Sequence, residues 1–265
     1  MKVFICADIE GTAGITDWDE AEKGKPGYAE FRSLMTAEIV AACDGARAAG
    51  ASEIVVKDAH WTARNLLVDE LGPDVRILRG WSGHPDRMMF GLDETFDAAV
   101  HVGHHAKSGS DANPLAHTFT RRVSRITLNG ATASEFTFNA LTAARYGVPT
   151  VFLSGDAEIC ADARALVPGI ATVETIAGFG AATLSLSPAA SRAAIRDTVE
   201  RALKAPVTGA VAALAAAYEL VIEFSTPVDA YRGSWYPGVE HPSPRTLVFR
   251  TTDYFEVQRA LQFIV

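Results

Sequence analysis

Short apolar runs alternate with longer helical segments through the first half of the chain, and this alternation restricts the fold more than any other feature. Residues 2–7 (KVFICA) form an uninterrupted apolar run that ends in acidic residues, which is typical of a strand buried on both faces. Residues 28–49 carry apolar side chains at helical spacing and end at Gly50, a common helix terminator. This alternation predicts an open, mostly parallel α/β sheet flanked by helices.

The same patterns predict the remaining elements. Further strands are expected at residues 53–57, 75–78, 97–103, 150–153, 171–176, 218–224 and 246–250. Further helices are expected at residues 134–146, 156–166, 187–204 and 253–265. Asn129-Gly130 is a tight-turn signal and predicts a projecting hairpin. Pro206 marks a boundary within residues 204–209, so we expect a catalytic α/β domain over residues 1–205 and a smaller α/β subdomain over residues 206–265.

Composition narrows the possible partners. The 265 residues include 24 basic and 32 acidic side chains, and a net charge of -8 without a basic cluster argues against nucleic acid and anionic lipid. The most apolar stretch, residues 210–217, is too short to span a membrane, and the first apolar run stops at Asp8 without a cleavage site. We therefore expect a cytoplasmic protein. Its three separated cysteines are expected to be buried, reduced thiols.

Acidic residues and histidines follow three of the predicted strands. The three strand ends carry Asp8 and Glu10, Asp58 and His60, and His104 and His105. Residues two apart in an extended segment point the same way, so Asp8 and Glu10 are expected to act together. Because ligands of open α/β sheets bind beyond the carboxyl ends of the strands, the sequence predicts a site at this edge.

The histidines indicate what this site binds. Four of the seven histidines lie between positions 101 and 117, and imidazole with carboxylate suits zinc or a similar divalent ion. Two ions need a shared ligand such as Asp8, which would hold them about 3.5–4 Å apart. Either His104 or His105 must point away if the segment stays extended. His117 lies in a loop beyond these residues, so it could be a free base or nucleophile rather than a ligand. His101 lies inside an apolar strand and is expected to be a hydrogen-bonded core histidine.

Six segments, in the same order along the chain, resemble motifs of the D-aminopeptidase DppA family, the M55 metallopeptidases. They are DIEG at residues 8–11, KDAH at 57–60, GLDETF at 91–96, GHHA at 103–106, LAH at 115–117, and SEF with Asn139 at 134–139. Each motif alone is weak, but together they are specific. The resemblance covers residues 1 to about 155 and weakens after that.

The resemblance implies a zinc-dependent aminopeptidase that releases an N-terminal, preferably D-, amino acid from short peptides or amides. It implies two Zn²⁺ ions per subunit and a homodecamer. The residues carried over are Asp8 as bridging ligand, Glu10, His60, His105 and Glu135 as further ligands, and His117 as nucleophile or base. Asp58, His104 and Asn139 are expected to support the ligands, Asp58 by orienting His60, or to contact substrate. Glu135 comes from the resemblance alone, since by its own chemistry it is only an acid at a helix N-terminus.

Departures from the family leave the substrate open. Ile9 stands where the family often has Met, the loop from His105 to His117 is one residue longer than expected, and Ala157 replaces an expected acid.

Two other functions compete with the aminopeptidase interpretation. The D-x-E-x-T start at Asp8 superficially resembles magnesium-dependent haloacid-dehalogenase-type phosphatases, whose chemistry has no place for the histidines. A non-catalytic protein that binds metal or peptide is the second alternative.

Overall fold

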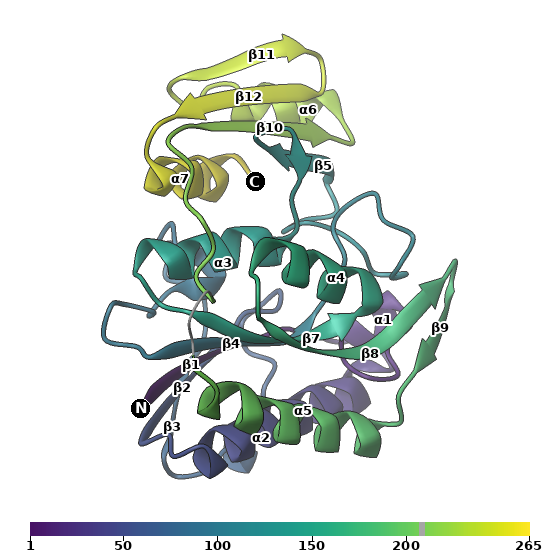
Figure 1. Cartoon of the computed structure of the whole chain (residues 1–265). Helices are drawn as coiled ribbons and strands as arrows, with labels where there is room; N and C mark the ends of the chain where they lie inside the picture. Colours follow the sequence, from purple (N-terminus) through teal and green to yellow (C-terminus); the bar gives the residue numbers. More distant parts are fainter. Residues whose placement is uncertain (207–209) are drawn as a thin grey trace.

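The computed structural model describes residues 1–206 and 210–265 and contains two β-sheets with associated helices (Figure 1). The larger sheet has seven strands in the order β3-β2-β1-β4-β7-β8-β9. They are β1 (Lys2–Ala7), β2 (Glu53–Asp58), β3 (Val75–Leu78), β4 (Ala98–His104), β7 (Thr150–Asp156), β8 (Ala171–Phe179) and β9 (Ala182–Ser185). All neighbours pair in parallel except β8 and β9, which are antiparallel. The predicted parallel sheet is confirmed.

Helices cover both faces of this sheet. In Figure 1, α2 (Tyr28–Ala48) and α5 (Pro188–Lys204) lie on one face, and α3 (Glu135–Arg145) and α4 (Ala157–Leu166) lie on the other. Strands β4 and β7 are buried along their whole length. Burial on two faces explains why these strands read as continuous apolar runs rather than as alternating patterns.

The second sheet is antiparallel and joins distant parts of the chain. Its order is β11-β12-β10-β5-β6. The strands are β5 (Val123–Leu128), β6 (Ala131–Thr132), β10 (Tyr218–Phe224), β11 (Val239–Ser243) and β12 (Thr246–Thr251), accompanied by α6 (Pro227–Gly233) and α7 (Tyr254–Ile264). The hairpin predicted at Asn129-Gly130 joins β5 to β6, and β5 pairs with β10. The division at residue 205 stays a prediction, and its boundary reaches residues 207–209, which lie outside the described residues.

Short or exposed elements are absent from the sequence prediction. They are α1 (Trp18–Ala21), η1 (Val68–Glu70), η2 (Arg87–Met89), β9, α6 and β11. Helix α1 has only four residues, too few for a periodic pattern, and depends on a capping box between Asp17 and Glu20. Strand β11 is almost entirely exposed, so it lacks an alternating pattern. Within residues 1–206 and 210–265, no helix is both long and apolar enough to cross a membrane.

Candidate metal centre

The register of the parallel sheet brings the three predicted strand ends together. Ala7, the last residue of β1, pairs with Asp58 on one side and with Val102 on the other. Beyond the strands, the amide of Asp8 donates to the carbonyl of Val102 at 2.9 Å, and the amide of Gly11 donates to the carbonyl of Gly103 at 2.8 Å. The segments that follow β1, β2 and β4 therefore share one edge of the sheet, as predicted.

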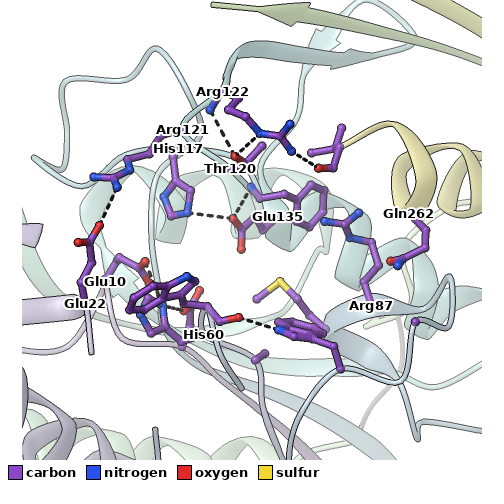
Figure 2. Close-up of a pocket in the computed structure, with 18 of the residues that line it drawn as sticks. Glu10, Glu22, His60, Arg87, His117, Thr120, Arg121, Arg122, Glu135 and Gln262 are labelled. Carbon is purple, nitrogen blue, oxygen red and sulfur yellow. Dashed lines mark hydrogen bonds and ion pairs between the residues drawn. The ribbon is translucent and has the colours of Figure 1, made fainter. Parts of the chain in front are cut away.

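Asp8 lies at the centre of a buried cluster of carboxylates and imidazoles. Its Oδ1 is 3.4 Å from His60 Nδ1, and its Oδ2 is 3.7 Å from His105 Nε2. Glu10 Oε1 lies 3.1 Å from the same His60 nitrogen, and Glu135 Oε1 lies 3.6 Å from the same His105 nitrogen. Two groups of three potential ligands, Asp8–Glu10–His60 and Asp8–His105–Glu135, thus share Asp8, and a third group, Glu10–His105–His117, overlaps both. Figure 2 shows Glu10, His60 and Glu135 directed into one cavity.

Hydrogen bonds fix which nitrogen of each imidazole faces the carboxylates. His60 Nε2 lies 2.9 Å from the carbonyl of Ala21, and His105 Nδ1 lies 2.9 Å from the carbonyl of Ala106. A carbonyl only accepts, so these nitrogens are the donors, and the opposite nitrogens face carboxylate oxygens. A lone pair cannot face a carboxylate favourably unless a cation lies between them, either a proton on the ring or a metal ion. Glu10 Oε2 and His105 Nε2 have no hydrogen-bond partner among the described residues. The cluster therefore fits a divalent metal.

Charge pairing dominates the titration of the cluster. Burial raises the pKa of Glu10, but the facing His60 outweighs burial and holds this pKa well below its usual range. Burial lowers the pKa of His60, but Glu10 and Asp8 raise it well above its ordinary value. Burial likewise opposes protonation of His105, yet the charges of Glu135, Glu10 and Asp8 raise its pKa to about 9. The same carboxylates that favour these protons would favour a metal ion.

His117 lies beside the cluster with one ring nitrogen free. Its Nδ1 lies 3.0 Å from the carbonyl of Leu115 and is the donor, so in the neutral ring the lone pair is on Nε2. That Nε2 is 3.6 Å from Glu135 Oε1. The ring stacks on His105, with centroids 4.3 Å apart. Burial first, and then the charge of His105, lower the pKa of His117, so its environment favours the neutral form.

The three residues expected to support the ligands differ in position. Asp58 accepts from the amides of Asn65 and Leu66, at 2.5 and 2.9 Å, and so holds the loop after β2. The His60 ring contacts the Ala21 carbonyl, and Asp58 is linked to His60 through Asn65, whose side-chain amide donates to Asp58 Oδ1 at 2.8 Å and to the His60 carbonyl at 2.7 Å. His104 is buried with Nδ1 4.0 Å from Asp8 Oδ2. Asn139 is buried and its amide contacts Met88 Sδ at 3.6 Å, away from the carboxylates.

Two glycines allow the backbone around His104 and His105 to pack closely. Gly103 has φ +76°, a left-handed conformation that turns the chain after His101, and a Cβ there would lie 2.3 Å from the Asp8 carbonyl oxygen. A Cβ on Gly155 would lie 2.0 Å from the carbonyl oxygen of His104. Asp156 next to it accepts from the amide of Ala106 at 2.6 Å. Asp156 thus positions the segment that carries His105, although sequence reasoning had considered this position only for its missing acidic neighbour.

The cluster opens into a cavity of about 550 Å³. Its walls include residues that sequence reasoning missed, namely Trp18, Trp61, Trp81, Arg87, Met88, Phe119, Arg121, Arg122, Gln262 and Val265. They come from loops, from short 3₁₀ or α-helical turns and from the end of α7, where no periodic pattern or strand end signals a function. The amide of Phe119 donates to Glu135 Oε1 at 2.6 Å, so the cavity wall is tied directly to the cluster.

A buried carboxylate–imidazole cluster at the strand ends of a parallel sheet, open to a cavity, is typical of metal-dependent hydrolases. The model of the peptidase M55 family, described as D-aminopeptidase, matches residues 1–263. The D-aminopeptidase of Bacillus subtilis (strain 168) is 29% identical in an alignment of 270 positions, which covers 98% of this chain and 95% of that protein. The solved structure of the Zn-dependent D-aminopeptidase DppA from Bacillus subtilis, a self-compartmentalizing protease, superposes with a TM-score of 0.92 at 27% identity. The match covers 100% of this chain and 96% of that one. The chain belongs to the D-aminopeptidase family.

Proposed function

We propose that this aminopeptidase uses two zinc ions per subunit to release an N-terminal D-amino acid from short peptides or amides. The observation that carries the proposal is the position of Asp8, whose two oxygens face two separate imidazoles, at 3.4 and 3.7 Å. A carboxylate in this position is suited to bridge two ions. The proposed ligands are Asp8, Glu10 and His60 for one ion and Asp8, His105 and Glu135 for the other. The zinc dependence of the B. subtilis relative supports the choice of metal.

The residues of the chain supply proton transfer and positioning. When bound, zinc provides Lewis acidity toward the scissile carbonyl and lowers the pKa of water. His117 is the proposed catalytic residue, because its Nε2 faces the cluster while its Nδ1 is held by Leu115. Through Nε2 it takes up a proton during attack on the carbonyl and returns it to the leaving nitrogen. The carboxylates themselves are buried, which strengthens their electrostatic interactions.

A panel of matched D- and L-alanyl dipeptides and amides tests this function. Chelator-stripped protein is assayed with and without added zinc, and release of free amino acid is measured. We expect zinc-dependent cleavage of the D-series. Binding of zinc without cleavage of any member of the panel would instead favour the non-catalytic binding protein.

The variant His117→Ala tests the role of His117. We expect loss of turnover with the zinc content of wild type, because His117 is not among the five proposed ligands. A parallel loss of zinc would show that His117 is a ligand rather than the proton carrier.

We further propose that the chain assembles into a homodecamer. The B. subtilis relative is described as self-compartmentalizing, and large apolar side chains are exposed on and beside α6 and on α7. Val228, Tyr231, Trp235 and Phe263 are each at least 60% exposed. Exposed apolar surface of this extent is typical of subunit contacts. Light scattering of the purified protein should give the mass of ten chains, and a monomer would contradict the proposal.

A further inference from the structure

Three arginines line the cavity, and one of them lacks an acidic partner. Arg121 Nη2 is 2.7 Å from Glu22 Oε1, and Arg122 Nη1 is 2.9 Å from Asp229 Oδ1. Among the described residues, Arg87 has no carboxylate oxygen within 4.0 Å. Burial lowers the pKa of Arg87 to about 10, so the guanidinium stays charged at neutral pH. Arg87 is half-buried, and a charged group that is partly withdrawn from water and has no acidic partner among the described residues favours an anionic ligand.

Arg87 is held firmly although it is unpaired. Its Nη1 donates to the carbonyl of Leu261 at 2.8 Å, and its guanidinium carbon lies 4.1 Å from the centre of the Phe119 ring. A guanidinium has five N–H donors, so most of them remain available for a ligand. This anchoring lowers the entropy that binding a ligand would cost.

Arg87 also lies next to the proposed catalytic cluster. The amide of Phe119 contacts Glu135 Oε1 at 2.6 Å, while the ring of Phe119 supports Arg87. Figure 2 shows Arg87 and Glu135 projecting into the same cavity. A peptide whose N-terminal amide bond lies at the cluster would therefore extend its other end toward Arg87.

We propose that Arg87 binds the C-terminal carboxylate of the substrate, which makes short peptides with a free C-terminus the substrates in preference to amides. Arginine and carboxylate form two parallel, charge-assisted hydrogen bonds, whereas a C-terminal amide is neutral and offers only one acceptor oxygen. This inference rests on the proposed function and specifies its substrate class.

Matched pairs of D-alanyl dipeptide acid and dipeptide amide test the subsite. In zinc-loaded wild type, kcat/KM should be higher for the acid than for the amide. Arg87→Met should raise KM for the acid by about 10- to 100-fold, the usual effect of losing hydrogen bonds to a charged group, and leave the amide unchanged. Arg87→Lys should recover part of the loss. Arg121→Met is the control, because Arg121 is already paired with Glu22, and it should not change the acid-to-amide ratio.

Calorimetry with the His117→Ala variant separates this subsite from turnover. The acid should bind more tightly than the amide, and adding Arg87→Met should abolish that difference. Equal affinity for both ligands, or binding of neither, overturns the Arg87 proposal. If wild type shows no turnover but binds the acid more tightly than the amide, and this preference depends on Arg87, the proposed function is refuted and the Arg87 proposal stands.

A different observation concerns three buried side chains behind the metal centre. Cys6, His101 and His104 are each at most 1% exposed. Cys6 on β1 pairs in register with His101 on β4, so both point to the same face of the sheet. Gly103, at φ +76°, breaks the alternation of β4, and the ring of His104 contacts that of His101 with centroids 5.1 Å apart. The sequence expectation for His101 is thus only partly met, because the ring is buried but neither of its nitrogens has a hydrogen-bond partner among the described residues.

The geometry points to a third metal site, formed by Cys6, His101 and His104, for a thiophilic ion. One ligand atom from each residue lies within 4.8 Å of the others, and an ion held between them would need bond lengths of about 2.0–2.3 Å. Thiolate with imidazole selects Zn(II) or Cu(I). The site borders the carboxylate-rich centre, because His104 Nδ1 lies 4.0 Å from Asp8 Oδ2, but it shares none of the five ligands proposed there and adds a sulfur.

Cobalt substitution distinguishes the two kinds of site. Stripped protein loaded with Co(II) should show a sulfur-to-cobalt charge-transfer band, which the Cys6→Ser and His101→Phe variants lose and the control Cys160→Ser keeps. Circular dichroism verifies folding. In a second arm, protein given Cu(I) as its glutathione complex should bind one ion more per subunit than Cys6→Ser. A band in the Co(II) arm assigns a zinc-type site, and extra uptake in the Cu(I) arm alone assigns a copper site. Absence of both overturns the proposal.

Discussion

Glu38 on α2 is a buried carboxyl group beneath the loop that follows Glu10. It is 2% exposed, and its Oε1 accepts from the amide of Ala13 at 3.1 Å and from Ser191 Oγ at 2.7 Å. Burial raises its pKa from an ordinary 4.5 to about 7, and the two hydrogen bonds only partly oppose this. At about 1.4 kcal/mol per pH unit, the difference corresponds to about 3 kcal/mol of unfolding free energy.

The sign follows from the direction of the shift. The folded state holds the proton more tightly than the unfolded state, so the contribution of Glu38 is fully present below about pH 4.5 and is lost as the pH rises to about 7. Glu38→Gln mimics the protonated form and keeps the acceptor for Ala13 and Ser191. We therefore expect the variant to match wild type near pH 4.5 and to exceed it by up to about 3 kcal/mol at pH 8.

Denaturant unfolding of both proteins at a series of pH values measures this difference. The protein concentration is held fixed and metal is removed, so that assembly and zinc binding do not contribute. Other titrating groups cancel in the comparison of variant with wild type. Parallel stability curves from pH 4.5 to pH 8 would refute the argument that burial, rather than hydrogen bonding, controls Glu38.

Three further predictions concern the metal centre. Asp8→Asn should remove both zinc ions and His60→Ala only one, as measured by metal analysis, and equal losses would contradict a bridging role for Asp8. Zinc binding should release protons and strengthen as the pH rises toward 9, because His105 has a pKa of about 9 without metal. Calorimetry in buffers of different ionisation enthalpy measures the proton release, and a zinc affinity that does not depend on pH would contradict the prediction. Gly155→Ala places a Cβ 2.0 Å from the His104 carbonyl oxygen and should cost about 1–3 kcal/mol in thermal unfolding, whereas an unchanged Tm would contradict the close packing.

The parallel sheet and much of the centre could be predicted because parallel strands end at one edge. From the sequence alone, that rule predicts one shared edge for Asp8, Glu10, His60 and the His104–His105 pair. It could not choose between the two histidines, since the left-handed Gly103 that decides their directions leaves no periodic signal.

Other parts of the site depend on tertiary structure that local patterns do not encode. Glu135 is by itself only an acid in the first turn of α3, and its direction toward His105 follows from the packing of that helix. Arg87 begins the short 3₁₀ helix η2, which is too short for a periodic pattern, and its anchor Leu261 is 174 residues further along the chain. The pairing of β5 with β10 also joins segments far apart in sequence, which no periodicity can reveal.

The strands of the antiparallel sheet come from distant parts of the chain, so the sheet cannot be completed until late in synthesis. All five proposed zinc ligands lie at or before residue 135, whereas β10, which pairs with β5 on the edge opposite β6, begins at Tyr218. On the ribosome, the ligand set is therefore complete long before β5 gains this neighbour. In that interval one edge of β5 is unpaired and open to association with other chains. An ion captured early would order the segments on either side of β5, so the supply of zinc during translation should influence how much protein folds and how much aggregates.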